Sequence, residues 1–112
     1  MSLSKSLFLL LAAAVLEAGG DALVRTGLHA RTPAKLGWFL AAALTLFGYG
    51  YVVNSPPWDF GKLLGVYVVV FFLVAQAISW IVYDQKPSSA VLLGGAFIVV
   101  GGAIISYSSI SN

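Results

Sequence analysis

The sequence predicts an all-α membrane protein with four transmembrane helices. Of its 112 residues, 60% are hydrophobic and 9% are charged, whereas soluble domains carry about 25% charged residues. Four apolar segments of 18 to 21 residues fill most of the chain, and a helix needs roughly 17–25 such residues to cross a bilayer. A membrane β-strand needs about half that length and alternates with period two, which these segments do not. Helices are therefore favoured over a barrel.

We expect a single domain over residues 1–112, with spans at residues 7–24, 36–53, 63–83 and 90–107. The short connections contain prolines, which interrupt a helix: Pro33 in the first, Pro56 and Pro57 in the second, and Pro87 in the third. The first span could instead be a cleaved signal peptide, because Lys5 precedes an apolar run that small residues follow. We favour a retained span, since cleavage would remove the acidic residue at its centre.

Orientation is weakly encoded by basic residues. If the first and third connections share a side, that side carries four of them and the other side carries two: Arg25, Arg31, Lys35 and Lys86 against Lys5 and Lys62. The positive-inside rule then places both termini outside the cytoplasm. The small margin also permits insertion in both orientations, and hence an antiparallel as well as a parallel dimer. We expect an integral protein of a prokaryotic inner (plasma) membrane.

Glu17 is the main candidate for function, because an acidic residue at the centre of a membrane helix costs roughly 2.5–3.5 kcal/mol and by default marks a site for ions, protons or solutes. Glu17, Asp21 and Arg25 are spaced four apart and share one helix face. The same face carries the small residues Ala13, Ala14 and Gly20. Small residues allow helices to approach closely, so this face is expected to point into the protein.

The two acids have different expected roles. Glu17, near mid-span, is the group expected to gain and lose protons, while Asp21 lies one turn closer to the interface and to Arg25. Simpler structural interpretations remain open for both acids. Asp21 could form an ion pair with Arg25, and Glu17 could form a structural hydrogen bond to Gln76 or Ser79 of the third span.

The composition argues against an enzyme. The chain has no cysteine and a single histidine, His29, so it has no thiolate nucleophile and no pair of imidazoles for a metal. We therefore expect no metal and no cofactor. The expected partners are the lipid bilayer, protons and a small solute, with no nucleic acid.

Three stretches resemble the small multidrug resistance family. LEAGGDALVRTG is similar to its first-helix pattern, with matches at Glu17, Gly20, Leu23 and Arg25. SWIVYDQKPSSAVLLGGAFIVVGGAIIS is similar to the end of its third helix and its fourth helix, with matches at Ser79, Trp80, Gln85, Gly94 and Gly101. In the third helix, Gly61 and Tyr67 match a glycine and an aromatic residue six apart. GVYVVVF also resembles a related four-helix family of bacterial inner-membrane proteins.

The resemblance implies a member of the drug/metabolite transporter superfamily: a homodimer of four-helix protomers that exchanges solute against protons. It implies that Glu17 is shared by substrate and protons, and that the helix with Gly94 and Gly101 forms the dimer contact. The spacing itself supports a flat strip on that helix, because Gly94 and Gly101, like Gly95 and Gly102, are seven apart, nearly two turns. Contacts within the protomer are the alternative.

Departures from the family pattern bear on the substrate. Tyr67 stands where the family has tryptophan, Leu64 where it has tyrosine, and Asp21 where it has a small polar residue. Val69 and Phe71 replace paired glycines. One large aromatic surface for cations is therefore missing, and a narrower, more polar site is expected, formed by Glu17, Asp21, Tyr67 and Gln76.

The sequence thus predicts a transporter resembling the small multidrug resistance family, an antiporter that exchanges a small polar or cationic solute for protons at Glu17. One alternative is a carrier of a neutral polar solute, such as a sugar or a lipid-linked headgroup. Another is a non-transport membrane subunit. A compact cation or a hydroxylated solute is expected to bind better than a bulky tetraphenyl-type cation.

Overall fold

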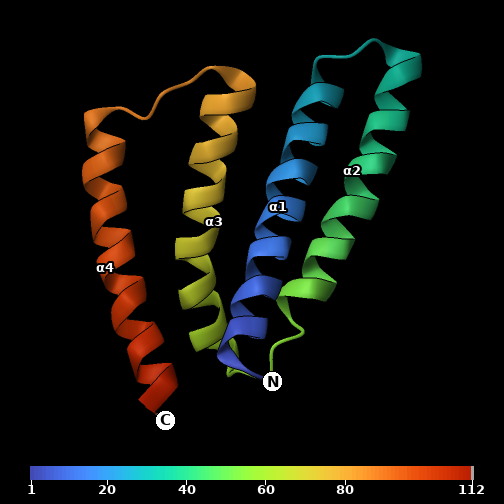
Figure 1. The fold of residues 1–112 in the computed structure, drawn as a ribbon. Coiled ribbons are helices and arrows are strands. Elements are labelled where there is room, and N and C mark those ends of the chain that lie inside the picture. Colours follow the sequence, from blue (N-terminus) through green and yellow to red (C-terminus); the bar gives the residue numbers. More distant parts are fainter. Residues whose placement is uncertain (112) are drawn as a thin grey trace.

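A computed structural model describes residues 1–111 as four helices joined by short connections (Figure 1). Their bounds are α1 Leu3–Leu28, α2 Thr32–Val53, α3 Phe60–Tyr83 and α4 Ser89–Ser111. Each helix is long and apolar enough to cross a membrane. The predicted all-α architecture of four membrane-spanning helices is therefore confirmed.

Most helix ends lie outside the predicted spans. α1 already begins at Leu3, because the Ser2 side chain accepts a hydrogen bond of 3.2 Å from the backbone nitrogen of Lys5 and so caps the helix. Pro33 lies in the first turn of α2 rather than in the connection, where its missing N–H costs no helical hydrogen bond. Hydropathy locates only the segment within the hydrocarbon, whereas helical hydrogen bonding continues into the polar flanks.

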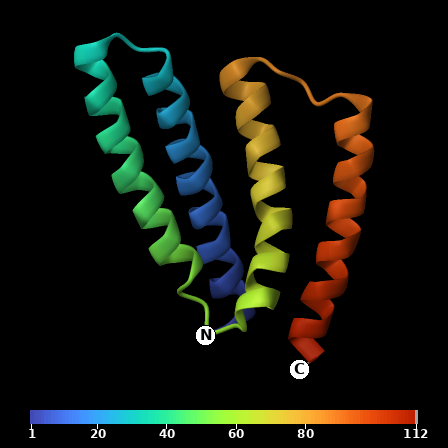
Figure 2. The ribbon, with the colours of Figure 1, turned by 180° about the vertical axis from the view of Figure 1, so that it is seen from behind.

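The helices form a row rather than a closed bundle. The order across the row is α2, α1, α3 and α4, and the view from behind shows the same order reversed (Figures 1 and 2). α1 packs against α2 and α3, and α4 packs against α3. The principal extents are 52 × 34 × 19 Å. A single layer leaves much apolar surface uncovered, and large side chains such as Phe47 and Ile81 point outward.

The core lies where α1, α2 and α3 meet, and its buried members are Leu10, Ala13, Ala14, Val53, Leu63, Val66 and Tyr67. The alanines let α1 approach its neighbours closely, as its small-residue face predicts. Gly20 serves the same purpose against α2, since a Cβ atom there would lie 2.5 Å from the Leu46 side chain. The small residues of this face of α1 point into the protein as predicted, whereas Asp21 and Arg25 of the same face are exposed.

The two ends of the row differ in which connections they carry. The α1–α2 and α3–α4 connections lie at one end, and the N-terminus, the α2–α3 connection and the C-terminal end of α4 lie at the other (Figure 1). The first and third connections therefore share a side, as the charge comparison assumes. Which side faces the cytoplasm stays a prediction.

Candidate functional site

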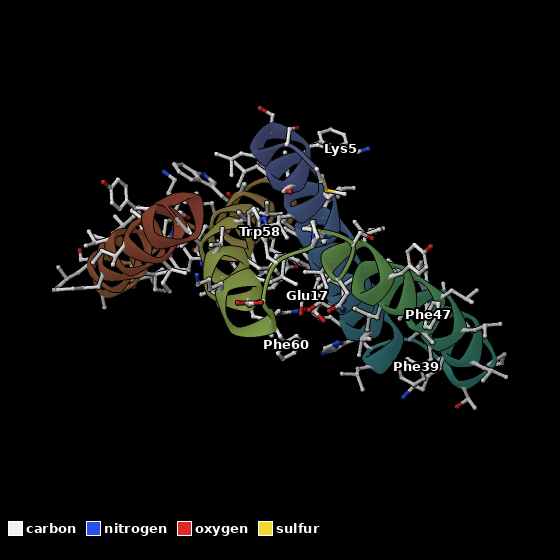
Figure 3. All side chains as sticks on the ribbon, turned by 90° about the horizontal axis from the view of Figure 1, so that it is seen from below. Lys5, Glu17, Phe39, Phe47, Trp58 and Phe60 are labelled. Atoms are coloured by element: carbon white, nitrogen blue, oxygen red, sulfur yellow. The ribbon has the colours of Figure 1, made fainter. Side chains whose placement is uncertain are left out.

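Glu17 lies near the middle of α1, at the place where α1, α2 and α3 come together when the row is viewed along its helices (Figure 3). The hydroxyl of Tyr67 on α3 donates a hydrogen bond of 2.8 Å to Oε1 of Glu17. This distance falls within the usual range for O–H···O bonds. Glu17 is half-buried, and Tyr67 is only 4% exposed. Tyr67 is thus the α3 partner of Glu17, in place of Gln76 or Ser79.

Tyr67 is the middle member of an aromatic cluster formed by Tyr49, Tyr67 and Phe71. Its ring centroid lies 5.7 Å from that of Tyr49 on α2 and 6.0 Å from that of Phe71, one turn along α3. Both distances are typical of paired aromatic rings. Through Tyr49 the cluster also links α2 to the α3 residue that binds Glu17.

The aromatic cluster contains two residues that the sequence analysis did not assign to the site. Tyr49 of α2 and Phe71 of α3 both lie beside the Tyr67 ring. Sequence reasoning missed both residues. The one available signal for Tyr49 is a phenol within an otherwise apolar span, and nothing in the sequence says which helix it faces.

Asp21 and Arg25 lie next to Glu17 along α1 but in different surroundings. Together with Tyr83 they line a cavity of about 350 Å³ between α1 and α3. In the described part of the chain, Arg25 does not form the ion pair with Asp21 that the sequence left open. Its guanidinium lies over the ring of Tyr83 instead, 5.0 Å from the centroid. Phe71, whose ring centroid lies 6.0 Å from that of Tyr67, also lines this cavity. The structure thus brings Glu17 and Tyr67 together and places Asp21 in an adjoining cavity.

Gln76 is not part of that region. It lines a separate cavity of about 470 Å³ between α3 and α4, together with Phe72 and Gly95. The reason is geometric, because residues 67 and 76 are nine apart, about two and a half helical turns, and so point to opposite faces of α3. The helical period alone could have separated Gln76 from Tyr67.

The glycines of α4 divide into two strips. A Cβ atom on Gly95 would lie 2.6 Å from the Phe72 ring, and one on Gly102 would collide with Val69, so this strip packs against α3. Gly94 and Gly101 have no such neighbour within 4 Å. We call Gly94 and Gly101 the outer glycine strip. Contacts within the protomer thus account for Gly95 and Gly102 and leave the outer strip uncovered.

Comparison with known proteins places the chain in a family. A family model described as "Uncharacterised BCR, YnfA/UPF0060 family" matches residues 3–111. The chain belongs to the UPF0060 family. No solved structure matches it significantly.

Relatives of this UPF0060 protein match more than nine-tenths of its length. A "UPF0060 membrane protein" of Herpetosiphon aurantiacus is 31% identical over 110 residues, which cover 96% of this chain and 97% of the relative. One of Nocardia farcinica is 36% identical over 108 residues, which cover 96% of each chain. One of Mycobacterium marinum is 33% identical over 106 residues, which cover 92% of this chain and 93% of the relative.

These names and the four apolar helices agree on an integral membrane protein. The family shown is UPF0060, and membership of the small multidrug resistance family stays an interpretation of the motifs.

Proposed function

We propose that this UPF0060 protein is a transporter of the small multidrug resistance type that exchanges a small cationic or polar solute for protons. The observation that carries the proposal is the Glu17 carboxyl group near the middle of the apolar helix α1, which accepts a hydrogen bond from the Tyr67 hydroxyl where three helices meet. A carboxyl group at that depth is costly to keep and is a candidate site for protons and solutes by default.

The surroundings of Glu17 favour a cationic ligand. A carboxylate supplies the opposite charge, and aromatic faces attract cations with about 0.5–2 kcal/mol each. Tyr49, whose ring packs beside that of Tyr67, is the candidate for such a face. A proton and a cation would compete for the same carboxyl group, so that binding of one requires release of the other. Such competition is the basis of exchange.

The packing of the aromatic cluster favours a compact ligand. Tyr67 is 4% exposed and is flanked on two sides by other rings, so that little of its own face is free for a bulky planar cation. A neutral polar solute is the second candidate, because the Tyr67 phenol binds Glu17 and a second phenol ring, Tyr49, lies 5.7 Å from the Tyr67 ring.

We also propose that the protein works as a homodimer, parallel or antiparallel. One layer of helices leaves Glu17 half-buried, and a second protomer facing it would enclose a chamber between the two layers. The outer glycine strip, Gly94 and Gly101, offers a flat face of α4 for the contact.

Transport is tested with purified protein in liposomes under a pH gradient. The panel contains compact cations, a tetraphenyl-type cation, sugars and a lipid-linked headgroup. We expect proton-linked flux of a compact cation, abolished in Glu17→Gln, which keeps the shape of the side chain and removes its titratable proton. Asp59→Asn, which alters an exposed acid just before α3, is the matched control and should transport normally.

Retained pH-driven flux in Glu17→Gln would refute the role of Glu17. Flux of a sugar or headgroup without proton coupling would establish the second candidate. Absence of flux for every solute would instead favour a non-transport subunit.

The dimer is tested by crosslinking between protomers in the membrane. Gly101→Leu should reduce crosslinking strongly, because it adds a side chain to the contact strip. Gly37→Leu on α2 is the matched control, since a Cβ atom there also meets nothing within 4 Å. If both variants crosslink like the parent protein, the outer glycine strip is not the interface.

A further inference from the structure

The cavity between the C-terminal ends of α1 and α3 carries two opposite charges that proton exchange at Glu17 does not use. Asp21 and Arg25 both line it and both are exposed. They lie one turn apart on α1, a rise of about 6 Å. Glu17 does not line this cavity, although Phe71, whose ring contacts Tyr67, does. The cavity is therefore a neighbour of the Glu17 site and not part of it.

The two charges do not pair with each other in the described part of the chain. The Arg25 guanidinium lies over the Tyr83 ring at 5.0 Å, a contact that fixes the side chain but leaves its N–H groups as donors for an anion. The Asp21 carboxylate accepts hydrogen bonds only, so its natural ligand is a cation or a neutral donor. One cavity thus offers a group for an anion and a group for a cation.

The α3 side of the cavity adds polar groups of fixed position. The Ser79 hydroxyl donates to the backbone oxygen of Gln85 at 3.2 Å and lies 3.4 Å from its side-chain oxygen. The amide oxygen of Gln85 is therefore engaged, and its NH₂ group remains a donor. Both residues line the cavity. Their hydrogen bonds hold the chain where it leaves α3, so the cavity has a defined wall on this side.

The volume of the cavity, and its position near the end of α1, limit the ligands that it can bind. Its volume of about 350 Å³ lies at the lower end of the range of roughly 300–1,000 Å³ for small-molecule sites. Arg25 lies three residues before the end of α1, a rise of about 4.5 Å. The end of a membrane-spanning helix is the level of the polar headgroups, where phospholipid phosphates lie.

We propose that this cavity binds a compact zwitterion, an ammonium and a phosphate group a few bonds apart, with the ammonium on Asp21 and the phosphate on Arg25. A guanidinium binds phosphate with two parallel hydrogen bonds, and the one-turn separation of the charges suits a ligand with both groups. Two sources share this chemistry: free phosphoethanolamine and the headgroup of phosphatidylethanolamine.

The free ligand is tested by calorimetric titration of the full-length protein in nanodiscs of phosphatidylglycerol. Phosphoethanolamine should bind at least ten-fold more tightly than ethanolamine or inorganic phosphate alone, because only the whole zwitterion meets both charges. Asp21→Asn and Arg25→Gln should each weaken it at least ten-fold. Lys86→Gln is the matched control, because Lys86 lies at the same end of the row, over Trp80 and outside the cavity.

The lipid source is tested by native mass spectrometry of protein released from nanodiscs that also contain phosphatidylethanolamine. Retention of that lipid by the parent protein and its loss in Asp21→Asn and Arg25→Gln would support the proposal with a lipid ligand, even if free phosphoethanolamine does not bind. Binding of neither form would overturn the proposal. The proposal would also be overturned if Asp21→Asn bound the zwitterion as the parent protein does. The same holds if Lys86→Gln and Arg25→Gln lost equal affinity for it.

Glu17→Gln separates this site from transport. The variant should lose proton-coupled flux and keep zwitterion binding, because Glu17 does not line the cavity. If its zwitterion binding falls as far as in Asp21→Asn, the two charges belong to the Glu17 site and the separate site is refuted.

Discussion

The hydrogen bond between Tyr67 and Glu17 predicts a measurable coupling between the two side chains. Tyr67→Phe removes only the hydroxyl group that donates to Glu17 at 2.8 Å. It keeps the ring and its contacts with Tyr49 and Phe71. Glu17→Leu removes the acceptor. In a double-mutant cycle, the decrease in the free energy of unfolding caused by Tyr67→Phe should therefore depend on whether Glu17 is present.

The size of the coupling follows from the charge and burial of the pair. Hydrogen bonds to charged groups contribute about 1.5–3 kcal/mol. Because Glu17 is only half-buried, we expect the Tyr67–Glu17 bond to lie at the lower end of this range. Side-chain bonds in a membrane protein average about 0.6 kcal/mol with a maximum near 1.7 kcal/mol. We expect a coupling free energy of about 1.5 kcal/mol, or about 12-fold in the unfolding equilibrium.

The assay is reversible unfolding of the purified protein in mixed micelles, with the free energy of unfolding measured for the parent, both single variants and the double variant. Tyr51→Phe is the control, because Tyr51 is 74% exposed at the end of α2 and should show no coupling to Glu17→Leu. A coupling below about 0.5 kcal/mol, the usual limit of additivity, would refute the inferred bond.

Three further changes test the packing and the aromatic cluster. Gly20→Val should lower the free energy of unfolding by about 1–3 kcal/mol through overpacking against α2. Gly19→Val should change it little, because a Cβ atom there meets nothing within 4 Å. Equal effects of the two variants in thermal unfolding would contradict the close packing at Gly20. Gly102→Leu should expose the α3–α4 connection to protease and Gly101→Leu should not, because Gly102 packs on α3 and Gly101 does not. Identical digestion rates would argue against that packing. Tyr49→Ala should weaken binding of a compact cation several-fold in equilibrium titration, and an unchanged affinity would remove Tyr49 from the site.

Much of the fold could be predicted because membrane insertion is decided locally. Each span must satisfy its own backbone hydrogen bonds within the bilayer, so that length and hydropathy are sufficient to identify four helices. The inward direction of the small residues on α1 could also be predicted, because small residues permit close contact between helices. These properties belong to single helices and need no knowledge of their neighbours.

The order of the helices and the partners within the site were decided by the tertiary structure. Nothing local to α2 or α3 says that Tyr49 and Tyr67 meet beside Glu17, or that Arg25 turns to Tyr83 rather than to Asp21. The physical reason is that lipid tails are as apolar as leucine, so an apolar side chain gains little by facing protein instead of lipid. The sequence of a helix that is apolar all round therefore does not indicate which face packs against a neighbour. Only the assembly of the helices into a row brings the polar groups together.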